Sequence, residues 1–248
     1  MERKESFDMD NRLNRLGRIY EKTVGRLIPM HGFFSVIFCF VFNSVLYFGL
    51  QVLMRGVEHH DFTSSFDRMI PFVPAWSIIY LGCYVFWGAN YILVTRQKKE
   101  EWFQFATADY LSRIVCAFFF IVLPTTNVRP EVVGTGLPET LMRFVYRMDD
   151  AANLFPSIHC LVSWFCFIGI RGREDVPKWY QGFSCIFAFL VFASTLFTKQ
   201  HYIIDVIAGV FLAEICYYIG KHTNIYIGVM KVFDRINHVV FWERIDEK

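Results

Sequence analysis

Six stretches of predominantly apolar residues follow one another along this chain, and polar or charged residues separate each stretch from the next. A helix needs about 20 such residues to cross the hydrocarbon core of a bilayer, and the third and fourth stretches are the short ones. The pattern predicts an all-α fold, a polytopic membrane helix bundle with six transmembrane helices. The predicted spans are Phe33–Met54, Phe72–Val94, Leu111–Val128, Ser157–Ile170, Tyr180–Thr198 and Tyr202–Ile219.

Two amphipathic segments flank this bundle, which extends over residues 33–219. In residues 1–32 the apolar side chains share one helical stripe and basic side chains surround it. That arrangement is typical of a helix lying on the anionic cytoplasmic leaflet, and a disordered basic tail is the alternative. Residues 220–248 also mix apolar and charged residues, which predicts an amphipathic cytoplasmic tail packed along the inner surface.

The composition agrees with a membrane protein. Hydrophobic residues make up 54% of the chain and aromatic residues 19%, including 28 Phe, which is more apolar bulk than a soluble domain of this size needs. The first apolar stretch follows a polar and basic segment and is too long for the core of a signal peptide. We therefore expect it to be a permanent span.

Lysine and arginine fall unevenly between the predicted loops. Both terminal segments, residues 96–99 and residues 171–178 are rich in them, and alternating spans place all four segments on one side. The positive-inside rule then predicts cytoplasmic N- and C-termini. The net charge of +2 reflects this topology and gives no reason to expect a nucleic-acid partner. The other side keeps Arg55, Arg68, Arg129, Arg143, Arg147 and Lys199.

No metal site or disulfide framework is predicted. All seven cysteines fall within predicted spans without metal-ligand spacing, and we interpret them as small buried apolar residues. The run Glu58-His-His-Asp61 consists of consecutive residues that cannot all reach one ion without a sharp turn. A solvated loop is therefore the preferred interpretation of that run.

The most informative stretch is Phe197–Asp205, where His201 and Asp205 lie four residues apart at the start of the sixth apolar stretch. Residues at this spacing share one face of a helix. A carboxylate at the centre of an inserted helix costs about 2.5 to 3.5 kcal/mol, so we expect Asp205 to be paired and functional. A carboxylate that accepts from one ring nitrogen leaves the other nitrogen free to act as nucleophile or base. A purely structural pair is the alternative.

The predicted topology brings two further polar stretches to the same face as His201. In Asn153–His159, Pro156 and Ser157 stand where a helix would start, since proline is tolerated at the first position and serine is a favoured cap. The free N–H groups of such an end bind phosphate well, and His159 would lie in the first turn. An interfacial histidine beside a cap is the alternative.

The third stretch lies in the longest predicted loop, residues 125–156, where a compact membrane protein would build a site or a lid. Arg129 carries a planar, permanently charged fork suited to phosphoryl oxygens, although it could equally be an interfacial anchor. In the same loop, Asp149 and Asp150 could contact an acceptor headgroup, but solvated loop carboxylates are commoner. Tyr202 either lines the pocket or belongs to the aromatic belt.

These residues resemble the type-2 phosphatidic acid phosphatase superfamily, which includes the vanadium haloperoxidases and, as relatives, the inositol phosphorylceramide and sphingomyelin synthases. The family pattern runs Lys-x6-Arg-Pro, then Pro-Ser-x-His, then Ser-Arg-x5-His-x3-Asp. The resemblance covers residues 111–219. The matching positions, in order and spacing, are Arg129, Pro130, Pro156, Ser157, His159, Ser194, His201 and Asp205.

The resemblance implies metal-independent phosphoryl transfer that uses no cofactor. His201 would attack phosphorus to form a phosphohistidine, Asp205 would orient it, and His159 would protonate the departing oxygen. Arg129, together with N–H groups near Ser157, would stabilise the equatorial oxygens. The remaining candidates are Ser194 and Lys199 as phosphate-binding residues and, less directly, Asn153 and Tyr202.

Two departures from the pattern bear on the substrate. Val122 stands where the family has its lysine and Thr195 where it has its second arginine, although Lys199 could replace one lost cation. A phosphodiester monoanion needs less positive charge than a terminal phosphate dianion. We therefore expect transfer of a phospho-headgroup between lipids, as in the synthase relatives. The motifs Asn-x-Phe-Pro-Ser-x-His and His-Tyr-x2-Asp of this chain resemble those of that branch.

Two alternatives to headgroup transfer stay open. One is a plain phosphatidic acid or polyprenyl diphosphate phosphatase, and the other is a catalytically silent relative that binds lipid or a partner protein. In the enzyme interpretations the substrate is a phospholipid or a polyprenyl phosphate in the bilayer. The active site lies on the extracytoplasmic or lumenal side. The sequence does not define the oligomeric state.

Overall fold

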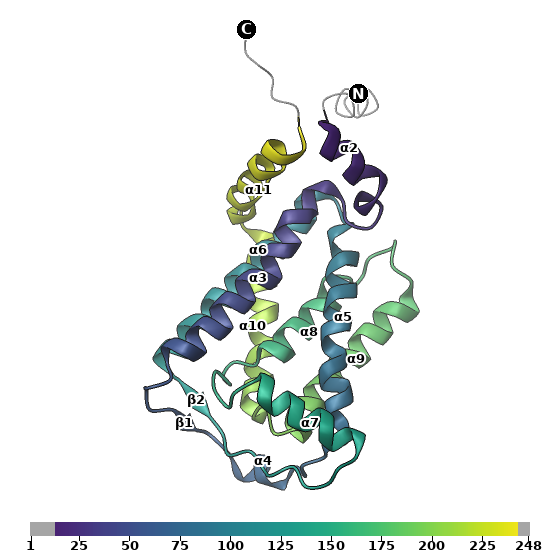
Figure 1. The fold of residues 1–248 in the computed structure, drawn as a ribbon. Coiled ribbons are helices and arrows are strands. Elements are labelled where there is room, and N and C mark those ends of the chain that lie inside the picture. Colours follow the sequence, from purple (N-terminus) through teal and green to yellow (C-terminus); the bar gives the residue numbers. More distant parts are fainter. Residues whose placement is uncertain (1–12, 243–248) are drawn as a thin grey trace.

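The structure is a computed structural model, and it describes residues 13–242 (Figure 1). The amphipathic segments predicted for residues 1–32 and 220–248 are therefore described only from residue 13 and up to residue 242. The parts of those two predictions that concern residues 1–12 and 243–248 lie outside the described residues.

The described residues form an all-α fold, as predicted, with ten α-helices. Two short strands, β1 (His60–Asp61) and β2 (Thr125–Thr126), pair in parallel, and two 3-10 turns cover Val24–Arg26 and Pro74–Trp76. The helices are α2 (Arg15–Lys22), α3 (Met30–Leu53), α4 (Ser65–Met69), α5 (Ser77–Thr95), α6 (Lys99–Val122), α7 (Leu137–Met148), α8 (Ile158–Ile168), α9 (Lys178–Phe197), α10 (Ile203–His222) and α11 (Ile225–Phe241).

Five helices are long and apolar enough to cross a membrane, which makes the chain a multi-pass membrane protein. They are α3, α5 with the turn before it, α6, α9 and α10. The predicted fourth span corresponds to α8, whose 11 residues extend only about 16 Å. A bilayer core is about 30 Å thick, so the prediction of six spanning helices is supported for five, and a crossing by α8 stays a prediction.

The molecule has two distinct ends (Figure 1). Residues 54–76, 123–157 and 198–202 gather at one of them, which we call the site end. Helices α2 and α11 and the α5–α6 turn lie at the other, which we call the far end. Helix α8 and the turn that follows it connect the two, because Gln97 Nε2 donates to the carbonyl oxygen of Gly169 over 3.1 Å. Alternating helices thus collect the three polar stretches at one end, as predicted.

The third predicted span was misplaced. Helix α6 begins at Lys99 and ends at Val122, whereas the apolar pattern predicted Leu111–Val128. Charged residues in its first half interrupt the apolar pattern, and one of them is neutralised from the second half: Arg113 Nη2 lies 2.6 Å from Asp109 Oδ1 in a fully buried ion pair. Charged residues within membrane helices normally pair in this way, so the sequence pattern understated the length of the helix.

Helix α10 holds the site together by packing closely on α8. A Cβ atom at Gly209 would lie 2.6 Å from the carbonyl oxygen of Ser157, so only glycine allows the first turn of α8 to approach this closely. The N–H of Ser157 also donates to the carbonyl oxygen of Asp205 over 3.1 Å. The second and third motifs are therefore joined through their backbones.

The two amphipathic segments pack against each other at the far end. Leu13, Tyr20 and Phe241 form a small apolar cluster, and the N–H of Asn14 donates to the carbonyl oxygen of Phe241 over 2.9 Å. The stripe predicted for residues 1–32 is thus partly covered by α11, while Leu16 stays exposed. All seven cysteines are free thiols, and all but Cys185 are buried, as their interpretation as small apolar residues predicted.

Candidate active site

The loop between α9 and α10 presents His201 beside Asp205. Nδ1 of His201 lies 3.2 Å from Asp205 Oδ2, and the same oxygen accepts the N–H of Tyr202 over 3.0 Å. His201 therefore precedes α10, and the prediction that both side chains project from one helix is wrong. The reason is local, because the N–H groups of Gln200 and His201 both bond back to the carbonyl oxygen of Thr195 and close a turn.

The second histidine lies in the first turn of α8. Ser157 caps this helix, since its Oγ accepts the N–H of Cys160 over 3.3 Å. Pro156 precedes the cap and so does not occupy the first helical position that the sequence suggested. The imidazole ring of His159 comes within 5.9 Å of that of His201, measured between ring centroids. Two histidines 42 positions apart in the chain thus lie close to each other.

Aromatic side chains from α5 enclose His159. Its ring stacks on that of Tyr80 at a centroid distance of 4.4 Å, and it also contacts Trp87. Its Nδ1 lies 3.5 Å from the Tyr80 hydroxyl, and its Nε2 lies 3.4 Å from the Tyr84 hydroxyl. The side chain is 7% exposed, so the protein shields this imidazole from bulk solvent.

Tyr80 connects His159 to a carboxylate. The Tyr80 hydroxyl donates to Asp149 Oδ2 over 3.1 Å, and Asp149 Oδ1 accepts from Tyr47 over 2.5 Å and from Gln51 over 3.3 Å. Asp149 is therefore held by three side chains from α3 and α5, rather than being a freely solvated loop carboxylate.

Arg129 ties together the loops around the site. Its guanidinium donates to the carbonyl oxygens of Asp149 and Asp150 and to Gln200 Oε1, the last over 2.6 Å. It also lies over the ring of Tyr146 at 4.9 Å. Its Nε atom is buried and has no hydrogen-bond partner among the described residues. Most of its donors are thus engaged by the protein itself.

The other predicted phosphate ligands are likewise engaged by the protein. Lys199 Nζ donates to the carbonyl oxygens of Asp67 over 2.8 Å and Ile70 over 2.5 Å. Burial lowers the pKa of the Lys199 ammonium group, and the negative charge of Asp67 opposes this shift. Ser194 is fully buried, and its Oγ donates to the carbonyl oxygen of Val191 over 2.7 Å.

Asn153 and Tyr202 position the loops of the site end. Asn153 is buried in a left-handed conformation, and its Nδ2 donates to the carbonyl oxygen of Tyr47 over 3.2 Å. The Tyr202 hydroxyl donates to Asp61 Oδ1 over 2.6 Å and also contacts the carbonyl oxygen of Thr126. Tyr202 thereby links the start of α10 to β1 and β2.

The positions at which the family pattern has two further cations supply none here. Val122 is the last residue of α6 and is 55% exposed. Thr195 is fully buried, and its hydroxyl donates to the carbonyl oxygen of Phe192 over 2.8 Å. Neither side chain can contribute positive charge to the site.

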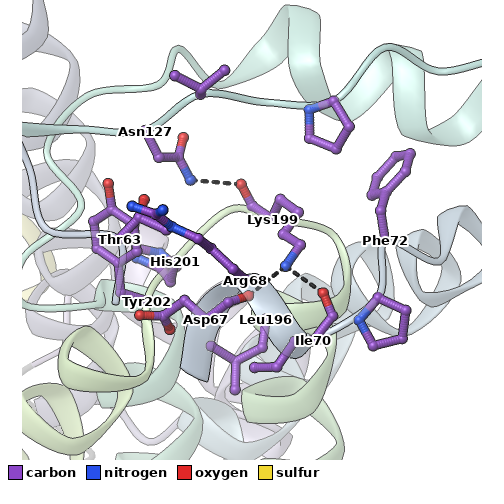
Figure 2. Close-up of a pocket in the computed structure, with 13 residues that line it drawn as sticks. Thr63, Asp67, Arg68, Ile70, Phe72, Asn127, Leu196, Lys199, His201 and Tyr202 are labelled. Carbon is purple, nitrogen blue, oxygen red and sulfur yellow. Dashed lines mark hydrogen bonds between the residues drawn. The ribbon is translucent and has the colours of Figure 1, made fainter. Parts of the chain in front are cut away.

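A cleft of about 510 Å³ opens beside His201 (Figure 2). One part of its wall is apolar and the rest is polar or charged, so a phosphate group and the adjoining part of a lipid would both find suitable surroundings. The lining residues come from α4 and the segments on either side of it, the segment that follows β2, the end of α9 and the α9–α10 loop. Those that matter below are Asp67, Arg68, Phe72, Leu196, Lys199, His201 and Tyr202.

Sequence reasoning missed the contribution of α4. Ser64 and Asp67 cap this helix reciprocally, and Asp67 Oδ1 also accepts the N–H of Ile203 over 2.8 Å. Burial opposes ionisation of Asp67, but hydrogen bonds from Ser64 and Ile203 outweigh it and lower the pKa of the carboxyl. A serine followed three residues later by an acidic residue is a helix-capping motif that can be recognised in the sequence. Its contact with α10 is tertiary and leaves no trace in the sequence.

No metal-binding cluster lies near these residues. Within residues 13–242, no group of three or more His, Cys, Asp or Glu side chains is arranged to hold an ion. His60 and Asp61, which belong to the run Glu58–Asp61, form strand β1.

Comparison with known proteins assigns the chain to a family. A family model described as the PAP2 superfamily matches residues 14–219, which extends the resemblance well beyond the predicted residues 111–219. No curated protein and no solved structure matches the chain. The match does not favour the synthase-like branch, which stays a prediction. The matched segment contains all three motifs, four of the five long apolar helices and all of α10 except its last three residues, and the chain belongs to the PAP2 superfamily.

Proposed function

We propose that this protein is a membrane enzyme that cleaves or transfers a lipid phosphoester through a phosphohistidine on His201. The observation that carries the proposal is the close approach of two differently held histidines, one of which lines the cleft. His201 lines the cleft and has a carboxylate on Nδ1, whereas His159 lies 5.9 Å away in an aromatic enclosure. This is the arrangement that an attacking base and a proton donor require.

The proposed reaction has two displacements and needs no cofactor. In the first, Nε2 of His201 forms a bond to phosphorus while the bond between phosphorus and the departing lipid oxygen breaks, and His159 gives its proton to that oxygen. In the second, water or an acceptor alcohol attacks phosphorus, its proton returns to His159, and the bond to His201 breaks. Asp205 holds His201 in the tautomer that leaves Nε2 unprotonated for attack.

We further propose that the substrate is a phosphodiester and that the second step transfers a phospho-headgroup. What supports this is the limited positive charge available to the phosphate. Val122 and Thr195 carry none, and the donors of Lys199 are directed to the carbonyl oxygens of Asp67 and Ile70. A diester monoanion tolerates such a site better than a dianion does.

The proposed orientation places the site on the extracytoplasmic or lumenal side, with both termini in the cytoplasm. Its support is the distribution of Lys and Arg, which concentrate in the loops and terminal segments of the far end. The site end lies opposite these segments, as Figure 1 shows. A lipid substrate would then enter from the outer leaflet.

The direct test is to trap the covalent intermediate. Purified protein in detergent or vesicles is quenched in alkali after mixing with a phosphodiester lipid labelled with ³²P in its headgroup phosphate. Wild-type protein should retain label in an acid-labile, alkali-stable form, as phosphohistidine does, and His201→Ala should retain none. Equal labelling of the two proteins would contradict the proposal.

The partition of the label tests headgroup transfer separately. Adding a lipid alcohol as acceptor should convert the label into a new diester lipid rather than into a water-soluble headgroup phosphate. Rapid release of inorganic phosphate from phosphatidic acid, without any transfer from a diester, would replace this part of the proposal with a plain phosphatase. If the His201→Ala protein kept the full biological function of wild type, the protein would be a catalytically silent relative that binds lipid or a partner protein.

A further inference from the structure

Arg68 reaches the site from outside the three motifs. It lies in α4, lines the same cleft as His201, and in Figure 2 its side chain extends toward His201. Its charge helps to lower the pKa of Asp61, against the effect of burial and together with hydrogen bonds from Thr63 and Tyr202. Arg68 and His201 thus share one cleft, in which a phosphate group could contact both side chains.

All the side-chain donors of Arg68 are available, whereas most donors of the other two cations near the site are engaged by the protein. Across residues 13–242, the Arg68 side chain makes no hydrogen bond and no ion pair. Arg129 gives three hydrogen bonds to the protein, and Lys199 gives two to backbone carbonyl oxygens. A planar fork with free donors is the group best suited to bind two phosphate oxygens at once.

The backbone that carries Arg68 is anchored to the catalytic loop on both sides. The residue before it, Asp67, accepts the N–H of Ile203 through its side chain and the Lys199 ammonium through its carbonyl oxygen. Two residues after it, the carbonyl oxygen of Ile70 accepts from Lys199 as well. These bonds fix α4 relative to His201, so the placement of Arg68 is built into the fold.

We propose that Arg68 binds the nonbridging phosphate oxygens of the substrate during attack by His201, in place of the arginine that is absent at Thr195. This inference rests on the proposed function. It also bears on the choice of substrate, because one guanidinium with free donors matches the single negative charge of a phosphodiester.

The test compares three full-length variants with wild type: Arg68→Ala, Arg68→Lys and Arg147→Ala. The last is the matched control, because Arg147 is an exposed arginine of α7 that does not line the cleft. We measure kcat/KM on a phosphodiester lipid and inhibition by orthovanadate, which mimics the pentacoordinate phosphorus and reports binding apart from turnover. Thermal unfolding in the same detergent checks that each variant is folded.

We expect Arg68→Ala to lower kcat/KM about 10- to 100-fold and to weaken inhibition by vanadate similarly, as loss of charge-assisted hydrogen bonds predicts. Arg68→Lys should recover part of the loss, and Arg147→Ala should stay within about twofold of wild type. A folded Arg68→Ala protein with unchanged kcat/KM and unchanged inhibition by vanadate would overturn the inference. If His201→Ala is inactive in that case, only the inference about Arg68 is wrong and the proposed function stands. An active His201→Ala protein would contradict both the inference and the proposed function.

Discussion

The two histidines of the site have opposite surroundings. His201 lies in a loop, lines an open cleft and contacts the Asp205 carboxylate directly. His159 lies in a helix, is enclosed by aromatic rings and is linked to a carboxylate through the hydroxyl of Tyr80, which donates to Asp149. One histidine is thus accessible and oriented by charge, whereas the other is sheltered and oriented by neutral hydroxyl groups.

This difference matches two chemical roles. A nucleophile must reach the substrate with an unprotonated nitrogen, and a direct carboxylate contact on the other nitrogen selects that tautomer. A general acid has to deliver one proton to one oxygen, and enclosure by aromatic rings keeps water from competing for that proton. The comparison therefore supports the proposal that His201 attacks and His159 donates the proton, and each of the following variants tests this proposal.

Replacing His201 with Ala should have the largest effect. Without the attacking nitrogen no covalent intermediate forms, so we expect kcat to fall at least about 10³-fold on every substrate, whatever its leaving group. Steady-state turnover of lipid and of an aryl phosphoester measures this. A variant that retains turnover of the aryl ester would show that His201 is not the nucleophile.

Replacing His159 with Ala should separate the two roles. With a lipid alcohol as leaving group we expect kcat to fall about 10²- to 10⁴-fold, because the departing oxygen receives no proton. With a nitrophenyl leaving group, which departs as a stable anion, most of the activity should return. The same loss on both kinds of ester would contradict the assignment of His159 as the acid.

Replacing Asp205 with Asn tests the direct carboxylate contact. Asparagine keeps the size of the side chain but removes the charge and can stabilise the wrong tautomer of His201. We expect kcat to fall about 10²-fold for good and poor leaving groups alike. The turnover of both kinds of ester is measured. A loss confined to the ester with the poor leaving group would indicate that Asp205 supports proton donation by His159 rather than attack by His201.

The part of the site that was predictable came from spacing and topology. The four-residue step between His201 and Asp205 and the serine cap before His159 are local signals. Alternating spans then place them at one end of the molecule without any knowledge of packing. Arg129 was found in the same way, but its engagement with Gln200 depends on how two distant loops meet.

The remainder depends on tertiary contacts that a single sequence does not display. The start of α6 was missed because charged residues make its first half look polar, although one of them, Asp109, is paired with Arg113 inside the protein. Arg68 looked like one of several outer cations, and its place in the cleft lining and the anchoring of Asp67 to Ile203 are what distinguish it. Charge by itself does not reveal which cation faces the substrate.

Replacing Tyr80 with Phe should have a smaller effect, and it should affect only proton donation by His159. The change removes the hydroxyl between His159 and Asp149, so we expect about a tenfold loss with a lipid leaving group and little loss with a nitrophenyl group. Tyr47→Phe is the matched control, because Tyr47 donates to the same carboxylate without contacting His159. Equal losses in both variants would indicate that Asp149 acts only by holding the loop.

Replacing Asp67 with Asn should give the smallest effect and only on the His201 side, where Asp67 anchors α4 to α10. Because the Asp67 pKa is lowered in the folded protein, its contribution to stability is present above the ordinary pKa of an aspartate and is lost as pH falls through the lowered value. The side chain borders the cleft and is partly screened by solvent, so we expect a loss of only about 1 kcal/mol at pH 7.

Thermal unfolding of wild type and Asp67→Asn across a pH series measures this contribution. The gap in Tm should be constant from neutral pH down to about pH 5, begin to narrow at about pH 4, the ordinary pKa of an aspartate, and close as the pH falls through the lowered pKa, where wild-type Asp67 becomes neutral like the asparagine. Because Asp67 does not contact His159, the ratio of activity on lipid and nitrophenyl esters should stay that of wild type. A change in this ratio would mean that the two sides of the site are coupled through α4, and the division of roles between the two histidines would then have to be revised.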